Sequence, residues 1–246
     1  MILIAGDIHA NFDLFFERVA NLSTRPTAIL QVGDLGGKSK EYPDFPIPTY
    51  FIQGNHENWD LLYGKGEGAE PLFSGVHSNS ANIYVPRNLH HLPNGRSIDV
   101  EGLCVVGLGG NYSSKYYVKG RSEMKGDRRR HFNYSEVLMC DKDSIEMECE
   151  LNRAFSDLEC PPFHGVDILL THEAPSPYMN RGRNCGIGKI NEAIRNAEPE
   201  LHFFGHHHHD GDYEYEGVKS YGLGMGYNTG ILLDPKTLEL ERISLE

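Results

Sequence analysis

Small polar clusters follow several short apolar runs of this sequence, and their side chains are of the kinds that bind metal ions. In chain order the clusters are Gly6-Asp7-Ile8-His9, Gly33-Asp34, Gly54-Asn55-His56-Glu57, Thr171-His172-Glu173 and Gly205-His206-His207-His208. They offer carboxylate, amide and imidazole groups without thiolate, a donor set that suits manganese, iron, zinc or magnesium at a mixed oxygen and nitrogen site. A glycine precedes the donors in most clusters, and we expect it to leave room for an ion. The pattern predicts metal-dependent chemistry and disfavours a structural zinc built on cysteine.

The spacing of the donors favours two ions over one. Asp7 and His9 are two residues apart, as are His206 and His208, and on extended backbone such residues point to the same side. We expect His207 and His209 to face the other way. The donors counted in this way are seven: Asp7, His9, Asp34, Asn55, His172, His206 and His208. One tetrahedral ion cannot use so many ligands, so we predict two ions that share a carboxylate.

The elements that must hold these donors alternate between strands and helices. Phe12, Phe15, Phe16 and Val19 have the spacing of a helix face that packs on a sheet, and Asn11 is a plausible cap for that helix. The turn-rich segments 213–221, 230–233 and 238–243 are expected to be antiparallel strands. Apolar runs predict further strands at 2–5, 28–32, 50–52, 103–108, 166–170 and 201–204. This order predicts an α/β protein with sheet-on-sheet packing and with its ligand sites at the ends of strands.

Composition narrows the class of protein. The chain has 246 residues, 39% of them apolar and 24% charged, as is usual for a soluble globular protein. The five cysteines form no C-x-x-C pair, which favours a reduced, cytoplasmic protein. No apolar run approaches the ~20 residues needed to cross a bilayer, so we expect no membrane association. We predict one domain over residues 1–246.

The segment around 111–160 departs from this pattern and is expected to be a basic insertion or cap. Residues 115–130 contain seven Lys and Arg against two acidic residues, whereas the whole chain has a formal net charge of −12. Residues 144–158 are expected to be helical. The negative total charge opposes indiscriminate binding of nucleic acid. The basic stretch 115–130 is therefore either a solvated loop or a local surface that recruits a polyanion.

The five clusters, in this order and at these separations, resemble the calcineurin-like metallophosphoesterase superfamily over residues 7–208. The resemblance implies a four-layer α-β-β-α sandwich with mixed sheets and a two-metal centre at the strand ends, manganese being the first expectation, then iron, zinc or magnesium. It also implies that Asp34 bridges the two ions. The implied ligands are Asp7, His9, Asp34 and His208 for one ion, and Asp34, Asn55, His172 and His206 for the other.

The implied activity is hydrolysis of a phosphoester by a metal-bridging hydroxide. His56 would then be the catalytic residue that assists the leaving group, and Glu57 would support it from behind. Candidate substrate contacts are Arg181 and Arg183, together with His131, which follows a run of three arginines. We predict a metal-dependent phosphoric ester hydrolase, either a phosphatase or a phosphodiesterase.

A narrower resemblance points to a more specific substrate. Segments 81–84, 89–92, 102–110 and 119–132 are similar in style to RNA lariat debranching enzymes. That likeness would imply a branched 2′,5′-phosphodiester substrate and a nucleic-acid partner bound through 115–130. The motifs are also compatible with a small-molecule phosphatase, a cyclic-nucleotide phosphodiesterase or a metal-binding module without catalysis. Ser/Thr protein phosphatases are disfavoured, because Leu35-Gly36-Gly37 and Gln53 stand where those enzymes carry phosphate-binding arginines.

Overall fold

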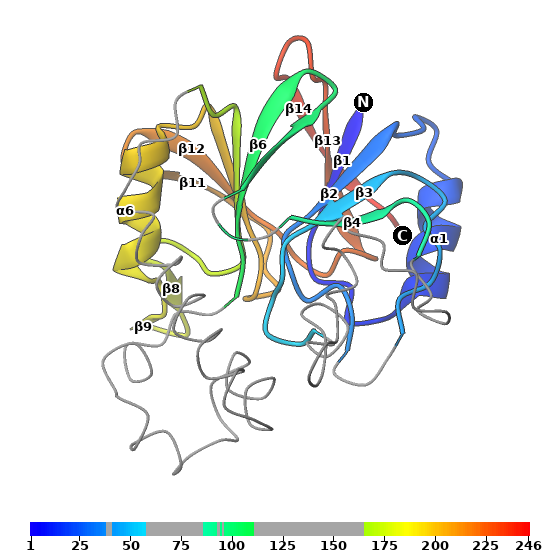
Figure 1. The fold of residues 1–246 in the computed structure, drawn as a ribbon. Helices are drawn as coiled ribbons and strands as arrows, with labels where there is room; N and C mark the ends of the chain where they lie inside the picture. Colours follow the sequence, from blue (N-terminus) through cyan, green and yellow to red (C-terminus); the bar gives the residue numbers. More distant parts are fainter. Residues whose placement is uncertain (38–40, 58–85, 93, 95, 111–164) are drawn as a thin grey trace, which may run out of the picture.

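The computed structural model describes residues 1–37, 41–57, 86–92, 94, 96–110 and 165–246. This part of the chain contains two six-stranded sheets and a short two-stranded one (Figure 1). The predicted insertion at 111–160, with the helix expected at 144–158, the basic stretch 115–130 and His131, lies outside the described residues. None of the described helices is long and apolar enough to cross a membrane.

The first sheet combines parallel and antiparallel neighbours. Its strands, in spatial order, are β14 (Leu240–Ser244), β13 (Thr229–Leu233), β1 (Ile2–Ala5), β2 (Ala28–Gln31), β3 (Thr49–Phe51) and β4 (Leu89–His91). Strands β1 to β4 run parallel to one another, whereas β13 is antiparallel to both β1 and β14. The carboxyl ends of β1, β2 and β3 therefore meet at one edge of this sheet.

The second sheet also combines parallel and antiparallel neighbours. In spatial order it consists of β11 (Gly211–Tyr215), β12 (Val218–Gly222), β10 (Leu201–Phe204), β7 (Ile168–Thr171), β6 (Leu103–Leu108) and β5 (Ser97–Val100). Its four central strands are parallel and its two edge strands are antiparallel. A separate hairpin, β8 (Met179–Asn180) with β9 (Arg183–Asn184), lies below helix α6 in Figure 1.

Alternation along β1 shows how the layers are built. Ile2 and Ile4 join a core that also contains Ile168 and Phe203 of the second sheet, so these residues lie between the sheets. Leu3 and its neighbours on the opposite face join the core beneath helix α1 (Phe12–Ala20). Both faces of the strand are buried, which is why the run is apolar throughout.

The two helices of the described segments complete the predicted four-layer sandwich. Helix α1 buries Phe12, Phe15 and Val19 against the first sheet, as their spacing predicts. Helix α6 (Gly188–Ala197) covers the outer face of the second sheet with residues such as Ile190 and Ile194. Figure 1 shows the two helices on opposite outer sides of the paired sheets. The α-β-β-α architecture with mixed sheets is confirmed.

Two local details of the described elements differ from the sequence prediction at a helix cap and at a turn. Asn11 occupies the cap position of α1, but its side-chain amide donates to the carbonyl oxygens of Ile8 and His9 and does not cap the helix. Segment 213–221 is not one strand but β11 and β12, joined at Glu216 and Gly217 with φ values of 54° and 80°. Two successive positive φ values are typical of a tight hairpin turn.

Candidate metal centre

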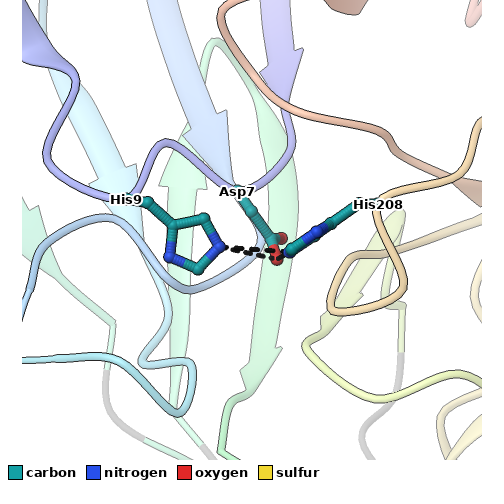
Figure 2. A group of neighbouring side chains, drawn as sticks. All are labelled: Asp7, His9 and His208. Carbon is teal, nitrogen blue, oxygen red and sulfur yellow. Dashed lines mark hydrogen bonds and ion pairs between the residues drawn. The ribbon is translucent and has the colours of Figure 1, made fainter.

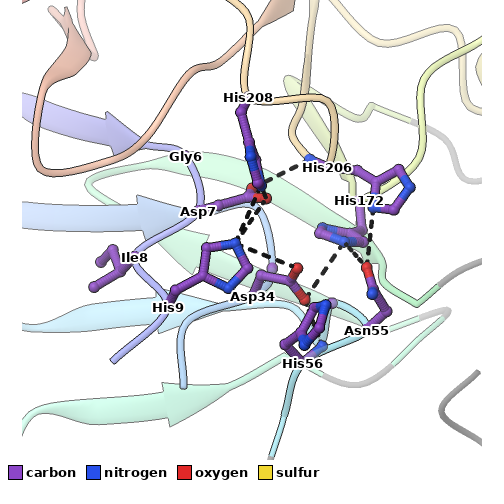
Figure 3. Close-up of polar contacts among 12 residues, drawn as sticks. Gly6, Asp7, Ile8, His9, Asp34, Asn55, His56, His172, His206 and His208 are labelled. Atoms are coloured by element: carbon purple, nitrogen blue, oxygen red, sulfur yellow. Dashed lines mark hydrogen bonds and ion pairs between the residues drawn. The ribbon is translucent and has the colours of Figure 1, made fainter. Parts of the chain in front are cut away.

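The loops that follow β1, β2, β3, β7 and β10 converge, and they bring all seven predicted donors into one constellation (Figure 3). Within it, two groups of metal-binding side chains are close enough to hold an ion each. The first contains Asp7, His9 and His208; the second contains Asp34, His172 and His206. The side chain of Asn55 lies against the second group. Each group combines donors that are far apart in the sequence.

The first group has distances that suit a single cation (Figure 2). His208 Nε2 lies 2.9 Å from Asp7 Oδ2 and 3.1 Å from His9 Nε2, and His9 Nε2 lies 3.8 Å from Asp7 Oδ2. Atoms bound to one ion at ~2.1 Å are at most about 4.2 Å apart. Asp7 Oδ2 is also buried, and apart from its contacts with these two histidines it has no hydrogen-bond partner among the described residues. A cation at this point would satisfy it.

The second group converges on the side-chain oxygen of Asn55. Asn55 Oδ1 lies 3.0 Å from His172 Nε2 and 2.9 Å from His206 Nδ1. The other ring nitrogen of His172 lies 2.9 Å from the carbonyl oxygen of Val32. That contact favours a proton on Nδ1, which leaves the lone pair of Nε2 directed toward the group. Two imidazoles and an amide oxygen thus converge, as the predicted second ligand set requires.

Asp34 stands between the two groups. Its Oδ1 lies 3.6 Å from His172 Nε2 in the second group, and its Oδ2 lies 3.8 Å from His9 Nε2 in the first. The carboxylate is almost completely buried. One oxygen therefore faces each group, which is the arrangement that a bridging ligand needs.

Burial prepares the histidines for metal binding. It lowers the pKa of His9 to about 4 and that of His206 to about 2, and it also lowers the pKa of His172. These rings are therefore neutral near pH 7, the form that coordinates metals. The pKa of His208 is raised instead, chiefly by its interaction with the carboxylate of Asp7.

The buried carboxylates point to the same conclusion. Burial raises the pKa of Asp34 well above its ordinary value, and the nearby carboxylates of Asp7 and Glu57 raise it further. Like charges this close are unfavourable in a buried site unless cations compensate them. The residues present therefore fit two divalent ions.

The comparisons with known proteins agree with this geometry. A family model described as calcineurin-like phosphoesterase matches residues 1–210. The chain belongs to the calcineurin-like phosphoesterase family. An uncharacterised protein of Haemophilus influenzae is similar to it, with 26% identity over 216 residues that make up 87% of this chain and 85% of that protein. A crystal structure of a Thermus thermophilus protein has a similar fold, with a TM-score of 0.54 and 14% identity over 100% of this chain and 98% of that one.

Membership of the calcineurin-like phosphoesterase family and the two ligand groups together support metal-dependent hydrolysis of phosphoesters. His56 has the position of a residue beside such a centre. Its backbone N–H donates to Asp34 Oδ1 at 2.6 Å, and its ring lies 5.3 Å from that of His9. The side chain belongs to neither ligand group and is exposed. Figure 3 shows it at the margin of the constellation.

The two-residue spacing of the donors predicts that they alternate along extended backbone. That prediction is wrong, because the backbone at three of the histidines is not extended. His9, His206 and His208 have φ values of 49°, 67° and 56°. This left-handed region is costly for residues with a side chain and is concentrated at functional sites. As a result His206 joins the second group and His208 the first. Tight turns at the strand ends, and not strand pleating, aim the donors.

Glycine is required next to the donors of this phosphoesterase because the clusters pack against one another. A Cβ on Gly54 would lie 2.2 Å from Asp34 Oδ1, and one on Gly205 would lie 2.5 Å from Asp7 Oδ1. A Cβ on Gly33 would lie 2.5 Å from His172 Nδ1. These glycines were expected to leave room for an ion. In the structure they leave room for the ligands of neighbouring clusters.

Glu57, which the resemblance placed behind His56, makes its described hydrogen bonds to the loops around the site. Its carboxylate is buried and accepts hydrogen bonds from the backbone N–H groups of Leu35 and Gly36, at 2.9 and 3.1 Å. It also accepts one from the Tyr42 hydroxyl at 2.6 Å and one from the N–H of Gly54 at 3.3 Å. Glu57 thereby joins the loop after β2 to the loop after β3.

Substituting Glu57→Ala should lower the free energy of unfolding of the metal-free protein by about 2–4 kcal/mol, because several buried donors lose their acceptor. Urea denaturation at pH 7 measures this change. The exposed helix residue Glu17 supplies the matched control, and Glu17→Ala should leave the midpoint nearly unchanged. An unaltered midpoint for Glu57→Ala would show that the carboxylate does not hold the two loops together.

The remaining predicted residues lie beside the ligand groups. Arg181 and Arg183 line a cleft together with Asn180, Cys185, His207, His208 and His209. His207 joins neither ligand group, as expected, and stacks on Tyr178 with ring centroids 4.4 Å apart. His209, the other histidine expected to face away, lines the same cleft.

Sequence reasoning missed two buried polar side chains that support the centre. The Gln31 side-chain amide donates to the carbonyl oxygens of Gly6 and Gly33, which joins the first two loops. The ring of His202 lies 2.9 Å from the hydroxyl of Thr171, and Thr171 is the residue directly before the predicted ligand His172. The available signal was a polar residue within or at the end of an otherwise apolar strand, because such a residue must find a partner when buried.

Proposed function

We propose that this protein hydrolyses phosphoesters with two divalent ions, one held by Asp7, His9, Asp34 and His208, the other by Asp34, Asn55, His172 and His206. The observation that carries the proposal is the carboxylate of Asp34, which directs one oxygen toward each group. Two ions that share a carboxylate can also share a phosphoryl group between them.

The bound ions would supply an activated water at neutral pH and neutralise charge on the phosphoryl oxygens. In the reaction, the oxygen of water forms a bond to phosphorus while the bond from phosphorus to the leaving oxygen breaks. His56 gives a proton to that leaving oxygen, and the proton that the attacking water loses passes to solvent, from which His56 is protonated again. The products are the free alcohol and phosphate, or a phosphomonoester when the substrate is a diester. Its exposure beside the ligand groups supports this role of His56, since the leaving group must face solvent to depart.

Manganese is the ion that we propose first. The donor set contains carboxylates, an amide oxygen and imidazoles, and no sulfur, which fits manganese and also admits iron, zinc or magnesium. In this proposal the glutamate behind the site, Glu57, is not a ligand, because its oxygens accept hydrogen bonds from the surrounding loops.

Purified protein supplied with manganese should hydrolyse at least one member of a panel made up of a phosphomonoester, a phosphodiester, cyclic nucleotides and a short branched RNA. Hydrolysis should stop when a chelator removes the metal and return when manganese is restored. A protein that holds two ions per chain, yet hydrolyses none of these compounds, would contradict the proposal and favour a metal-binding module. Preference for the branched RNA, lost when Arg128, Arg129 and Arg130 are neutralised, would favour a debranching activity.

A further inference from the structure

The cleft beside the metal centre has room for more of a substrate than its phosphoryl group. Its volume is about 650 Å³, and His208 forms part of its wall. The same histidine lies 2.9 Å from Asp7 in the first ligand group. Ligand pockets of small molecules commonly have volumes of about 300–1,000 Å³. A substrate with its phosphoryl group at the ligand groups can therefore extend into this cleft.

The lining of the cleft is basic, although the protein as a whole is acidic. Arg181 and Arg183 stand on its wall with three histidines, and none of the described lining residues is acidic. The chain carries a formal net charge of −12. Three other arginines of the described segments are ion-paired: Arg87 with Asp44, Arg195 with Glu216, and Arg242 with Asp210 and Asp212. Neither cleft arginine has an ion pair with any described residue. Both are available for an anion.

Arg181 lies in the two-residue turn of the short hairpin beside the cleft. Arg181 and Gly182 connect β8 to β9 with φ values of 49° and 75°. A hairpin turn with two positive φ values strongly favours Asn or Gly at its first position. The turns at Glu101–Gly102 and Glu216–Gly217 have similar positive φ values and do not line the cleft, so the role of Arg181 rests on its place in the cleft wall and not on its backbone conformation.

The hairpin is also fixed in place before any ligand binds. Asn184 Oδ1 accepts hydrogen bonds from the N–H groups of Tyr178 and Gly186, at 2.9 and 3.0 Å. The Asn184 amide donates to the Ser176 hydroxyl at 2.9 Å. The side chain of Asn191 on α6 in turn bonds both the N–H and the carbonyl of Ser176, each at 2.7 Å. Because the hairpin is already ordered, it loses little conformational entropy when a ligand binds, and this favours affinity.

We propose that Arg181 and Arg183 bind a second phosphate group, so that the preferred substrates are small molecules with two phosphates, one cleaved at the ligand groups and the other held in the cleft. Planar guanidinium groups match the oxygens of a phosphate and form charge-assisted hydrogen bonds with it. This inference rests on the proposed function, because it assigns the two ends of one substrate to neighbouring sites.

The matched pair of fructose 1,6-bisphosphate and fructose 6-phosphate tests the proposal. The wild-type enzyme should prefer the bisphosphate in kcat/KM by about tenfold or more, as expected for one or two charge-assisted contacts. The double variant Arg181→Asn and Arg183→Gln should reduce that preference to less than about twofold. It keeps an Asn-Gly turn, so the hairpin should still form. Arg25→Gln, an exposed arginine before β2, is the control and should keep the preference.

A binding measurement separates this inference from the proposed function. Cys185 is an exposed thiol on the wall of the cleft. In metal-free protein, fructose 1,6-bisphosphate should slow alkylation of Cys185, measured on its peptide by mass spectrometry, and the double variant should lose this protection. Protection of Cys185 without hydrolysis of any phosphoester would contradict the proposed function and support the cleft assignment. Equal protection in wild type and variant, or an unchanged kcat/KM preference in the variant, would overturn the cleft assignment.

Discussion

Asp34→Asn should lower metal affinity by more than about 100-fold and leave fewer than two ions bound per chain. Loss of a residue that merely orients a ligand already costs ~10–100-fold, and Asp34 faces both ligand groups with separate oxygens. The rate of phosphoester hydrolysis should fall by at least the same factor as the metal affinity. Titration against a chromophoric chelator measures the affinity, and elemental analysis measures the number of bound ions.

The same variant separates loss of metal from loss of folding. Without metal, Asp34 is a buried carboxylate near the carboxylates of Asp7 and Glu57. Its replacement by a neutral amide should leave the metal-free melting temperature unchanged or raise it, while the stabilisation that metal adds should disappear. Asp13→Asn, on the exposed face of α1, is the control and should behave as wild type. Two tightly bound ions in the Asp34 variant would disprove the bridging assignment.

His56→Ala should reduce turnover of an alkyl phosphate by about 10²–10⁴-fold, the range typical of general acid catalysis. A nitrophenyl phosphate, whose leaving oxygen needs no proton, should lose less than about tenfold. Metal content should not change, because the His56 ring belongs to neither ligand group and its backbone N–H, which bonds Asp34, is retained. Steady-state rates with both substrates, measured at saturating manganese, give the comparison.

His90→Ala provides a histidine control on β4, where the ring stacks on Tyr50 and not on a predicted ligand. It should leave both rates within about twofold of wild type. Equal losses on the alkyl and nitrophenyl substrates in His56→Ala would mean that His56 orients the phosphoryl group and does not protonate the leaving oxygen. Wild-type turnover of the alkyl substrate would remove His56 from the mechanism altogether.

Most of the fold could be predicted because its signals are local. The runs at 2–5, 103–108 and 201–204 match β1, β6 and β10 at both ends, since strands buried on both faces are continuously apolar. The face of α1 followed from the spacing of its aromatic residues. Strands β4 and β5 were not indicated, because each contains exposed polar positions that dilute the apolar pattern.

The candidate site could be predicted as a list of donors but not as a geometry. Asp7, Asp34 and His172 follow strands whose ends are readable, so their presence at one edge was foreseeable. The left-handed turns at His206 and His208 were not, because no local pattern distinguishes them from extended backbone. They place the two histidines in different ligand groups, as the family resemblance implied and as the two-residue spacing alone did not.

From the sequence it was possible to name the candidate metal ligands, most of the buried strands, the buried face of α1, and the family to which the chain belongs. These properties depend on residue type and on periods of two to four residues. Only the folded structure shows that tight turns, and not strand pleating, bring residue 208 to residues 7 and 9, that Glu57 joins two loops, and that an arginine hairpin borders the centre. Those contacts depend on the order in which distant strands pair across two sheets, and that order results from packing over the whole chain and not from any local pattern.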